Sequence, residues 1–215
     1  VPELRFALAR DVGRKRGVNY NIDNVIIQPG GKPTIWKFLA TVMNKNDEVL
    51  YPNPGYPIYE SQIAYQGGKP IPYSYIETKN GFDINIDKLE RSISDKTTVL
   101  IINNYHNPLS ASSSDQELEL LADLAVKHNL WVLSDDAYFE IRYSSDAAKS
   151  IVSFPGMQER TVILYTFSKK YAMTGWRLGA SIGPENVIKE MARFNINDES
   201  CTNHFIQFAL SSVLE

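Results

Sequence analysis

Short apolar runs alternate with helical patterns along the whole of this 215-residue sequence. Seven runs have the length and composition of buried strands, namely Val25–Ile27, Glu48–Tyr51, Lys69–Tyr73, Thr98–Ile102, Leu130–Leu133, Val162–Tyr165 and Leu178–Gly183. Between them, helical patterns cover residues 3–16, a stretch ending near Met43, and residues 57–66, 86–92, 115–128, 184–194 and 202–214. This order predicts an α/β fold of three layers, with helices on both faces of a mostly parallel, seven-stranded sheet. The two prolines in Lys69–Tyr73 place that strand at a sheet edge.

The charge balance and the cysteine count narrow the function classes. The net charge is −3, with 22 Lys and Arg against 25 Asp and Glu, which argues against nucleic-acid and anionic-membrane partners. The single Cys201 excludes an intrachain disulfide and a multi-cysteine metal site. His106, His128 and His204 have no metal-ligand spacing, so we expect no metal and place them on loops or helix surfaces. With no apolar run of membrane-spanning length, we expect a cytoplasmic protein.

Chemically useful residues follow five of the predicted strands. They are Gly31, Tyr56, Asn107, Asp135 and Lys169. Ligands of open α/β sheets bind outside the carboxyl ends of the strands, so we expect these residues to meet around one site. Each also has a plainer interpretation by itself: a Gly-Gly turn, a packed loop aromatic, an Asn-Pro turn, a helix cap and a solvated basic turn.

Two of these segments indicate the charge of a ligand. The Gly30-Gly31 turn before a helix that begins at Pro33 places backbone N–H groups at a helix N-terminus, which suits an anion. Asp135 and Asp136 are adjacent carboxylates at a strand end, and burying one without a partner costs free energy. They either cap the following turn or face a cation.

The segment after Val162–Tyr165 carries the most specific pattern. Lys169 leaves a buried strand, and in a partly desolvated site its neutral amine, the form that condenses with a carbonyl, would be favoured. Arg177 and the hydroxyl groups of Thr166 and Ser168 are suitable phosphate ligands.

Residues 166–179 resemble the lysine signature of the pyridoxal-phosphate aminotransferases of class I/II, which have fold type I. The resemblance extends along the whole chain and implies the roles of the site residues. Lys169 takes the position of the lysine that forms the Schiff base with pyridoxal 5'-phosphate. The implied ligands of the cofactor phosphate are Gly31, Lys32, Thr166, Ser168 and Arg177.

The same resemblance implies how the cofactor ring is held. Tyr56 takes the position of the aromatic that stacks on the pyridine ring, and Asp135 that of the partner of the ring nitrogen. Asn107 and Tyr138 match the residues that contact the 3-hydroxyl group. Asp136 fills a Glu position of the family, and we assign it no catalytic role.

Three positions depart from the family pattern. Thr166 replaces Gly or Ser, and Pro33 stands where many members have Gln. Leu109-Ser110 replaces the family's Thr-Gly. If that glycine has a positive backbone dihedral angle, Ser110 must adopt it at a cost, or the loop must differ.

The resemblance implies an enzyme that transfers an amino group from an L-amino acid to a 2-oxo acid, in amino acid metabolism. Lys169, Asp135 and Tyr138 would be its catalytic residues. Two alternatives stay open: a pyridoxal-phosphate-dependent lyase of the same fold, and a truncated, inactive cofactor-binding fragment. Both ends of the chain look cut, so we expect residues 1–215 to form the cofactor-binding large domain, without the N-terminal arm and the C-terminal small domain. Family members are homodimers, and we expect the same here.

Overall fold

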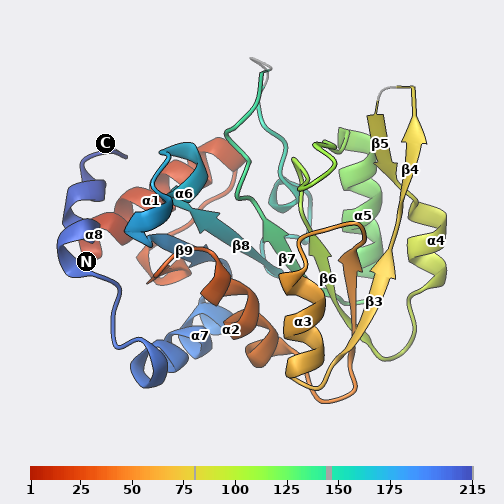
Figure 1. Cartoon of the computed structure of the whole chain (residues 1–215), viewed down its shortest axis with the longest axis horizontal. Helices are drawn as coiled ribbons and strands as arrows, with labels where there is room; N and C mark the ends of the chain where they lie inside the picture. The colour runs from red at the N-terminus through yellow and green to blue at the C-terminus, as the bar shows by residue number, and fades with distance from the viewer. Residues whose placement is uncertain (80, 144–146, 215) are drawn as a thin grey trace.

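The computed structural model describes residues 1–79, 81–143 and 147–214, and is shown in Figure 1. The main sheet has seven strands in the order β1-β9-β8-β7-β6-β2-β3. Its strands are β1 (Val25–Gln28), β2 (Glu48–Pro52), β3 (Lys69–Tyr73), β6 (Thr97–Ile102), β7 (Trp131–Asp135), β8 (Thr161–Thr166) and β9 (Gly179–Ile182). Strand β9 pairs antiparallel with β1 and β8, and the other pairs are parallel. The predicted seven-stranded, mostly parallel sheet is confirmed, with β3 at an edge.

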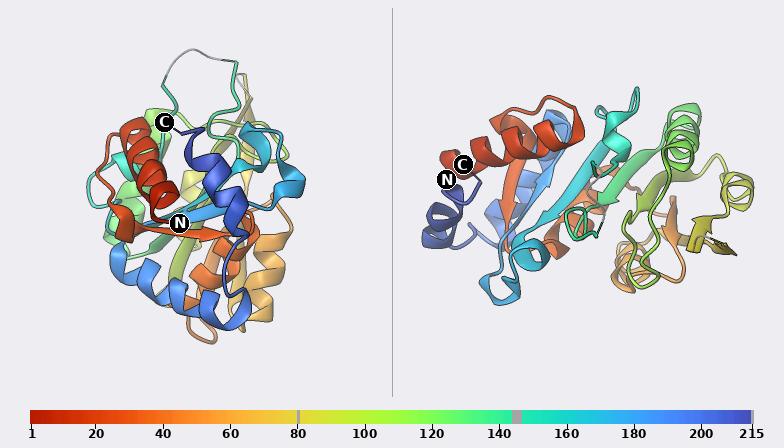
Figure 2. Two further views of the ribbon diagram at one scale, coloured as in Figure 1. Left: turned by 90° about the vertical axis from the view of Figure 1, so that its left-hand side faces the viewer. Right: turned by 90° about the horizontal axis from the view of Figure 1, so that it is seen from above.

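The helices also follow the sequence pattern closely. They are α1 (Pro2–Arg16), α2 (Lys32–Val42), α3 (Ile58–Tyr65), α4 (Ile86–Arg91), α5 (Asp115–Lys127), α6 (Phe167–Lys170), α7 (Glu185–Asp198) and α8 (His204–Ser211), with short 3-10 turns at Ile22–Asn24, Ile151–Ser153 and Thr174–Trp176. Among the described residues, no helix is long and apolar enough to cross a membrane. Helices lie on both faces of the sheet, as Figure 2 shows.

Alternate side chains of β1, β2, β6, β7 and β8 supply two opposite cores. On one face, α2, α3 and α7 pack against residues such as Val99, Ile101 and Leu133. On the other face, α1 and α8 cover Val25, Ile27, Ile163 and Tyr165, and α5 covers Leu100, Ile102 and Val132. Because successive side chains of a strand point to opposite faces, the continuous apolar runs bury both faces of the sheet. This is the predicted three-layer α/β/α arrangement.

Helix α5 begins after its N-cap Ser114, and the sequence pattern of a capping box, Ser114 followed three residues later by Glu117, is only half realised. The Ser114 hydroxyl accepts a hydrogen bond from the backbone N–H of Glu117, at 3.1 Å. The Glu117 carboxylate accepts a hydrogen bond from the N–H of Ile84 at 2.5 Å, rather than returning to the cap residue. The helix is therefore tied to the neighbouring hairpin through the side chain expected to close its own cap.

That hairpin is the main element that the sequence analysis missed. Strands β4 (Tyr75–Thr78) and β5 (Gly81–Ile84) pair antiparallel. The polar, turn-rich composition of residues 79–96 predicts no strand where β5 lies, and no element was predicted for β4. The ring of Tyr75 lies 4.6 Å from that of His106, measured between centroids. His106 lies on a loop, as predicted, but it is buried rather than at the surface. Burial lowers the pKa of His106 to about 4.

Strands β6, β7 and β8 end at the same edge of the sheet. The parallel register aligns Ile102 with Ser134, and Asp135 with Leu164. The residues that follow these strands are therefore neighbours in space, although about thirty residues separate them along the chain.

Candidate active site

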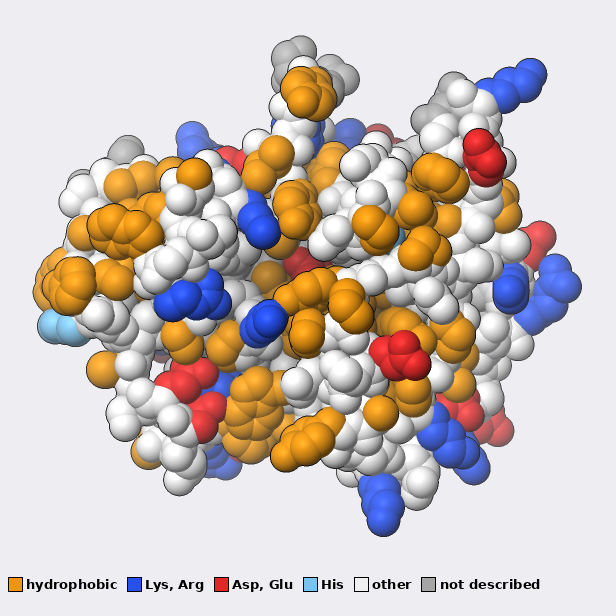
Figure 3. All heavy atoms as spheres, viewed as in Figure 1, with side chains coloured by type: hydrophobic (Ala, Val, Ile, Leu, Met, Phe, Trp, Pro, Cys, Tyr) orange, Lys and Arg blue, Asp and Glu red, His pale blue; other side chains and the backbone are white. Residues whose placement is uncertain are grey.

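One cavity of about 220 Å³ lies at the carboxyl edge of the sheet. It is lined by all ten residues predicted for the site, which are Gly31, Lys32, Tyr56, Asn107, Asp135, Tyr138, Thr166, Ser168, Lys169 and Arg177. Five further residues complete its lining: Ile35, Asn103, Ala137, Leu164 and Thr174. Figure 3 shows basic side chains around a hollow near the middle of this face. The strand ends thus bring together the residues singled out in the sequence.

Asp135 is a buried acid of this cavity. Its Oδ2 accepts a hydrogen bond from the hydroxyl group of Tyr59 at 2.5 Å, and its Oδ1 accepts one from the N–H of Ala137 at 3.2 Å. Burial raises the pKa of Asp135 to about 6, although both hydrogen bonds act to lower it. A cation beside this carboxylate would favour its charged form.

Two positioning residues around Asp135 were missed. Tyr59 lies on α3, one turn after Tyr56, and their rings meet edge to face with centroids 5.7 Å apart. The Asn103 side chain donates a hydrogen bond to the carbonyl of Asp135 at 2.9 Å and accepts one from the N–H of Asn107 at the same distance. Asn103 thereby joins the loop carrying Asn107 to β7. Its place directly after the apolar run at Ile102 was the available sequence signal.

The glycine turn before α2 forms a cradle with Arg177. A Cβ atom at Gly30 would lie 2.2 Å from Nη2 of Arg177, and one at Gly31 would lie 2.6 Å from Cδ2 of Leu164. The guanidinium group donates hydrogen bonds to the carbonyls of Thr174, at 2.7 Å, and Pro29, at 3.2 Å. The N-terminus of α2 and an arginine therefore face the same space, which suits an anion.

Lys169 lies on the short helix α6, which begins directly after β8. The hydroxyl of Thr166 caps this helix by accepting a hydrogen bond from the N–H of Ser168 at 3.2 Å. Nζ of Lys169 lies 5.6 Å from the centroid of the Tyr138 ring. Lys169 is exposed, so the partly desolvated environment expected for it is not present in the described chain.

Asp136 is engaged away from the cavity. Its Oδ2 accepts hydrogen bonds from Nε and Nη2 of Arg16, at 2.9 and 2.5 Å, and both side chains are buried. Its Oδ1 accepts a hydrogen bond from the Ser134 hydroxyl at 2.6 Å. Of the two adjacent carboxylates, Asp136 is thus paired with Arg16 of the protein, whereas Asp135 lines the cavity.

The loop with the unusual Leu109-Ser110 sequence keeps a left-handed residue. Ser110 has a φ of 54°, and its N–H donates a hydrogen bond to the carbonyl of His106 at 2.7 Å. Ser110 therefore adopts the positive dihedral angle for which glycine is better suited.

A family model described as "Aminotransferase class I and II" matches residues 1–214. The chain belongs to this aminotransferase family. The relationship suggested by the lysine signature is confirmed.

Two curated aminotransferases illustrate the relationship. "Aromatic-amino-acid aminotransferase 2" of Thermococcus litoralis is 38% identical over 213 residues, or 99% of this chain and 54% of the relative. "Aspartate aminotransferase" of Pyrococcus abyssi is 34% identical over 215 residues, or 100% of this chain and 55% of the relative. The chain spans about half the length of these curated relatives.

Solved aminotransferase structures have the same fold. The aromatic aminotransferase from Pyrococcus horikoshii OT3 matches with a TM-score of 0.96 and 34% identity, covering 100% of this chain and 58% of that one. The aspartate aminotransferase from Thermus thermophilus, solved with maleate, matches with a TM-score of 0.94 and 29% identity, covering 100% of this chain and 55% of that one. The predicted large-domain fold is that of this aminotransferase family.

Proposed function

We propose that this chain is the cofactor-binding large domain of a pyridoxal-phosphate-dependent aminotransferase. The reaction is the transfer of an amino group from an L-amino acid to a 2-oxo acid. One observation carries the proposal: the cavity holds a buried carboxylate, Asp135, together with an amine, Lys169, and an anion cradle at Gly31 and Arg177. A ligand of this cavity, which has a volume of about 220 Å³, needs three groups: a cation for the carboxylate, a group that reacts with the amine, and an anion for the cradle. Few small molecules carry all three.

The residues present fit pyridoxal 5'-phosphate. The raised pKa of Asp135 reflects a buried carboxylate, which a protonated pyridine nitrogen would stabilise. The α2 N-terminus, Arg177 and Ser168 would hold the phosphate, because N–H groups and guanidinium bind phosphate oxygens well. Tyr56, half-buried beside the cavity, would cover one face of the ring.

The bound cofactor supplies an electron sink for carbanion chemistry at the substrate α-carbon. Asp135 would keep the ring nitrogen protonated, and Asn107 and Tyr138 would orient the 3-hydroxyl group. Lys169 would hold the cofactor through its amine and, once a substrate amine has displaced it, move the proton at the α-carbon. The substrate class follows from the family, and aspartate and aromatic amino acids, named for the relatives, are the donors to try first.

The proposal also covers the oligomeric state and the cellular compartment. We infer a homodimer, as in the family, because exposed Lys169 needs a cover that excludes water from the chemistry. The free, exposed Cys201 suits a reducing compartment such as the cytoplasm.

Borohydride reduction in the presence of pyridoxal 5'-phosphate, followed by peptide mass mapping, tests the proposal. We expect one cofactor adduct, on Lys169, which is lost in Lys169→Ala and kept in the control Lys127→Ala, at a surface lysine outside the cavity lining. An adduct spread over surface lysines would refute the assignment of the site. Amino-acid consumption that needs no 2-oxo acid acceptor would indicate a lyase instead.

A further inference from the structure

The lysine beside Lys169 is engaged in an ion pair. Nζ of Lys170 lies 2.8 Å from Oε2 of Glu140 and 4.7 Å from the centroid of the Tyr171 ring. The Lys170 side chain is 24% exposed, whereas Lys169 counts as an exposed residue. Two neighbouring amines on one short helix therefore have different surroundings.

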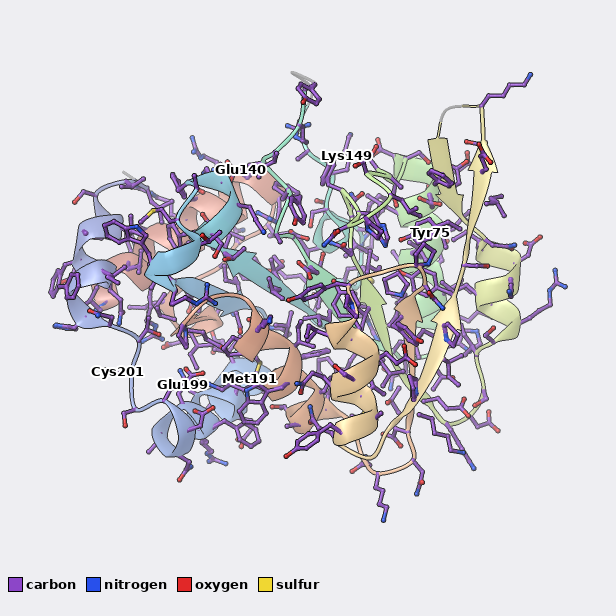
Figure 4. All side chains as sticks on the ribbon, in the orientation of Figure 1. Tyr75, Glu140, Lys149, Met191, Glu199 and Cys201 are labelled. Carbon is purple, nitrogen blue, oxygen red and sulfur yellow. The ribbon has the colours of Figure 1, made fainter. Side chains whose placement is uncertain are left out.

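Glu140 is itself fixed by helix α1. Nζ of Lys15 lies 2.9 Å from Oε2 and 3.0 Å from Oε1 of Glu140, and 2.7 Å from Oδ2 of Asp11. Asp11 is buried, which fixes one end of this chain of charges in the protein. Figure 4 labels Glu140 in the region where α1 and α6 approach the segment after β7. The carboxylate thus connects three parts of the chain.

The ion pair fixes the orientation of α6. Successive residues of a helix point about 100° apart, because a turn contains 3.6 residues. If Lys170 is held toward Glu140, then Lys169 must point elsewhere, and its Nζ lies over the Tyr138 ring. Tyr138 is two residues before Glu140, so one short segment contacts both lysines.

The ion pair also decides which amine can react. Burial by itself acts to lower the pKa of Lys170, but its hydrogen bonds, foremost that to Glu140, raise the pKa well above the usual value. An ammonium group has no lone pair to attack a carbonyl carbon. Lys170 is thereby held in its unreactive form, while Lys169 has no such anchor among the ion pairs of the described residues.

We propose that Glu140 is a positioning residue that selects Lys169 over Lys170 as the amine that condenses with an aldehyde. In that step the neutral amine nitrogen adds to the aldehyde carbon and one water leaves. That the aldehyde belongs to pyridoxal 5'-phosphate rests on the proposed function. The difference in reactivity between the two lysines belongs to the protein alone.

Competitive trace acetylation without cofactor tests this difference directly. Fragment-ion mass spectrometry would give the acetylation rate of each lysine in the wild-type protein, in Glu140→Gln and in the control Glu90→Gln. Glu90 forms a 2.8 Å ion pair with Lys127 on the surface, and neither residue lines the cavity. We expect Glu140→Gln to raise the Lys170 rate about tenfold, equivalent to one pKa unit, and Glu90→Gln to leave it unchanged.

Two further variants separate a local effect from loosening of the fold. Lys15→Met removes the second cation but keeps the Glu140–Lys170 pair, so Lys170 should stay unreactive. In a Lys169→Ala background, borohydride trapping with pyridoxal 5'-phosphate should label Lys170 only after Glu140→Gln is added. Equal acetylation of both lysines in the wild-type protein, or a Lys15→Met effect as large as that of Glu140→Gln, would overturn the proposal. Because acetylation needs no cofactor, its result is independent of whether the proposed function holds.

Discussion

The hydroxyl group of Tyr59 donates a hydrogen bond to Oδ2 of Asp135 at 2.5 Å inside the protein. Tyr59 is fully buried, and Asp135 is 5% exposed. Burial and the neighbouring Asp135 charge raise the pKa of Tyr59 well above its usual value, so it stays a donor throughout the physiological range. The Asp135 carboxylate thus has two neutral hydrogen-bond donors, the Tyr59 hydroxyl and the Ala137 N–H, and a cation beside it would stabilise its charged form.

This environment makes the stability of the folded chain depend on pH. The folded pKa of Asp135, about 6, lies above the ordinary value of 3.8 that applies when the chain is unfolded. The folded state therefore binds more protons between these values, and stability falls as pH rises through this window. Relative to Asp135→Asn, we expect wild-type stability to drop by about 2 kcal/mol between pH 4 and pH 7 in urea unfolding. Parallel pH profiles of the two proteins would contradict this.

The hydrogen bond from Tyr59 influences the folded-state pKa of Asp135, and therefore the pH range over which stability changes. It acts to lower the pKa of Asp135, so Tyr59→Phe should raise that pKa. A hydrogen bond to a charged group is worth about 1.5–3 kcal/mol, so we expect a rise of roughly 1 to 2 units. Titration of the Asp135 carboxyl carbon by NMR would measure it. Tyr65→Phe, at an exposed position on the same helix, is the matched control and should leave the titration unchanged.

Substitution of Gly30 separates backbone strain from loss of the anion cradle. Gly30→Ala introduces a Cβ that would lie 2.2 Å from Nη2 of Arg177, at a φ of +96°. We expect a loss of about 1–2 kcal/mol in stability from the left-handed backbone, and binding of pyridoxal 5'-phosphate weakened at least about tenfold because Arg177 must move. Gly17→Ala is the control: its φ is +67°, with no described atom within 4 Å of the added Cβ. It should lose similar stability and keep its affinity in a fluorescence titration.

The place of the site was predictable from the sequence because of how parallel sheets are built. Apolar runs such as Val162–Tyr165 are unambiguous, and polar residues that follow them must gather at one edge. Contacts distant in sequence were not predictable in this way. Tyr59 and Asp135 are 76 residues apart, and nothing in the local pattern around Tyr59 marks its partner.

The errors share one physical origin, which is tertiary contact. The strands Tyr75–Thr78 and Gly81–Ile84 contain exposed residues and lack the apolar run of a core strand. Because this hairpin was not predicted, the sequence did not indicate that Tyr75 packs against His106, and the burial of His106 was not foreseen. Similarly, Glu117 accepts a hydrogen bond from the N–H of Ile84 in the hairpin, a partner that the local capping-box pattern does not indicate.

Ser110 offers a test of stored backbone strain. It adopts a φ of 54°, which costs a residue with a side chain about 1–2 kcal/mol, whereas glycine loses about 0.5–1 kcal/mol in conformational entropy. We therefore expect Ser110→Gly to stabilise the protein by about 0.5–1 kcal/mol in urea unfolding. Ser112 lies outside the set of residues with positive φ, so Ser112→Gly should have the opposite sign. Destabilisation by both substitutions would show that the loop carries no such strain.

The buried pair of Arg16 and Asp136 should be strongly coupled. Removing one partner of such a pair leaves an uncompensated buried charge, so Arg16→Met and Asp136→Asn should each cost about 3–5 kcal/mol at pH 7. The double variant should cost much less than the sum, and a double-mutant cycle by urea unfolding measures the difference. Additive losses would mean that the two side chains are stabilised separately.

The Arg16–Asp136 pair also influences the pKa of Asp135 in the cavity. The charge of Asp136 acts to raise the pKa of Asp135, and Arg16 lies against Asp136 at 2.5 Å. In Arg16→Met the negative charge of Asp136 loses its counter-ion, so the pKa of Asp135 should rise above about 6. Adding Asp136→Asn should bring it back below the value in Arg16→Met, because the source of repulsion is gone. A carboxyl titration of Asp135 that stays unchanged in Arg16→Met would show that Arg16 anchors helix α1 without influencing the site.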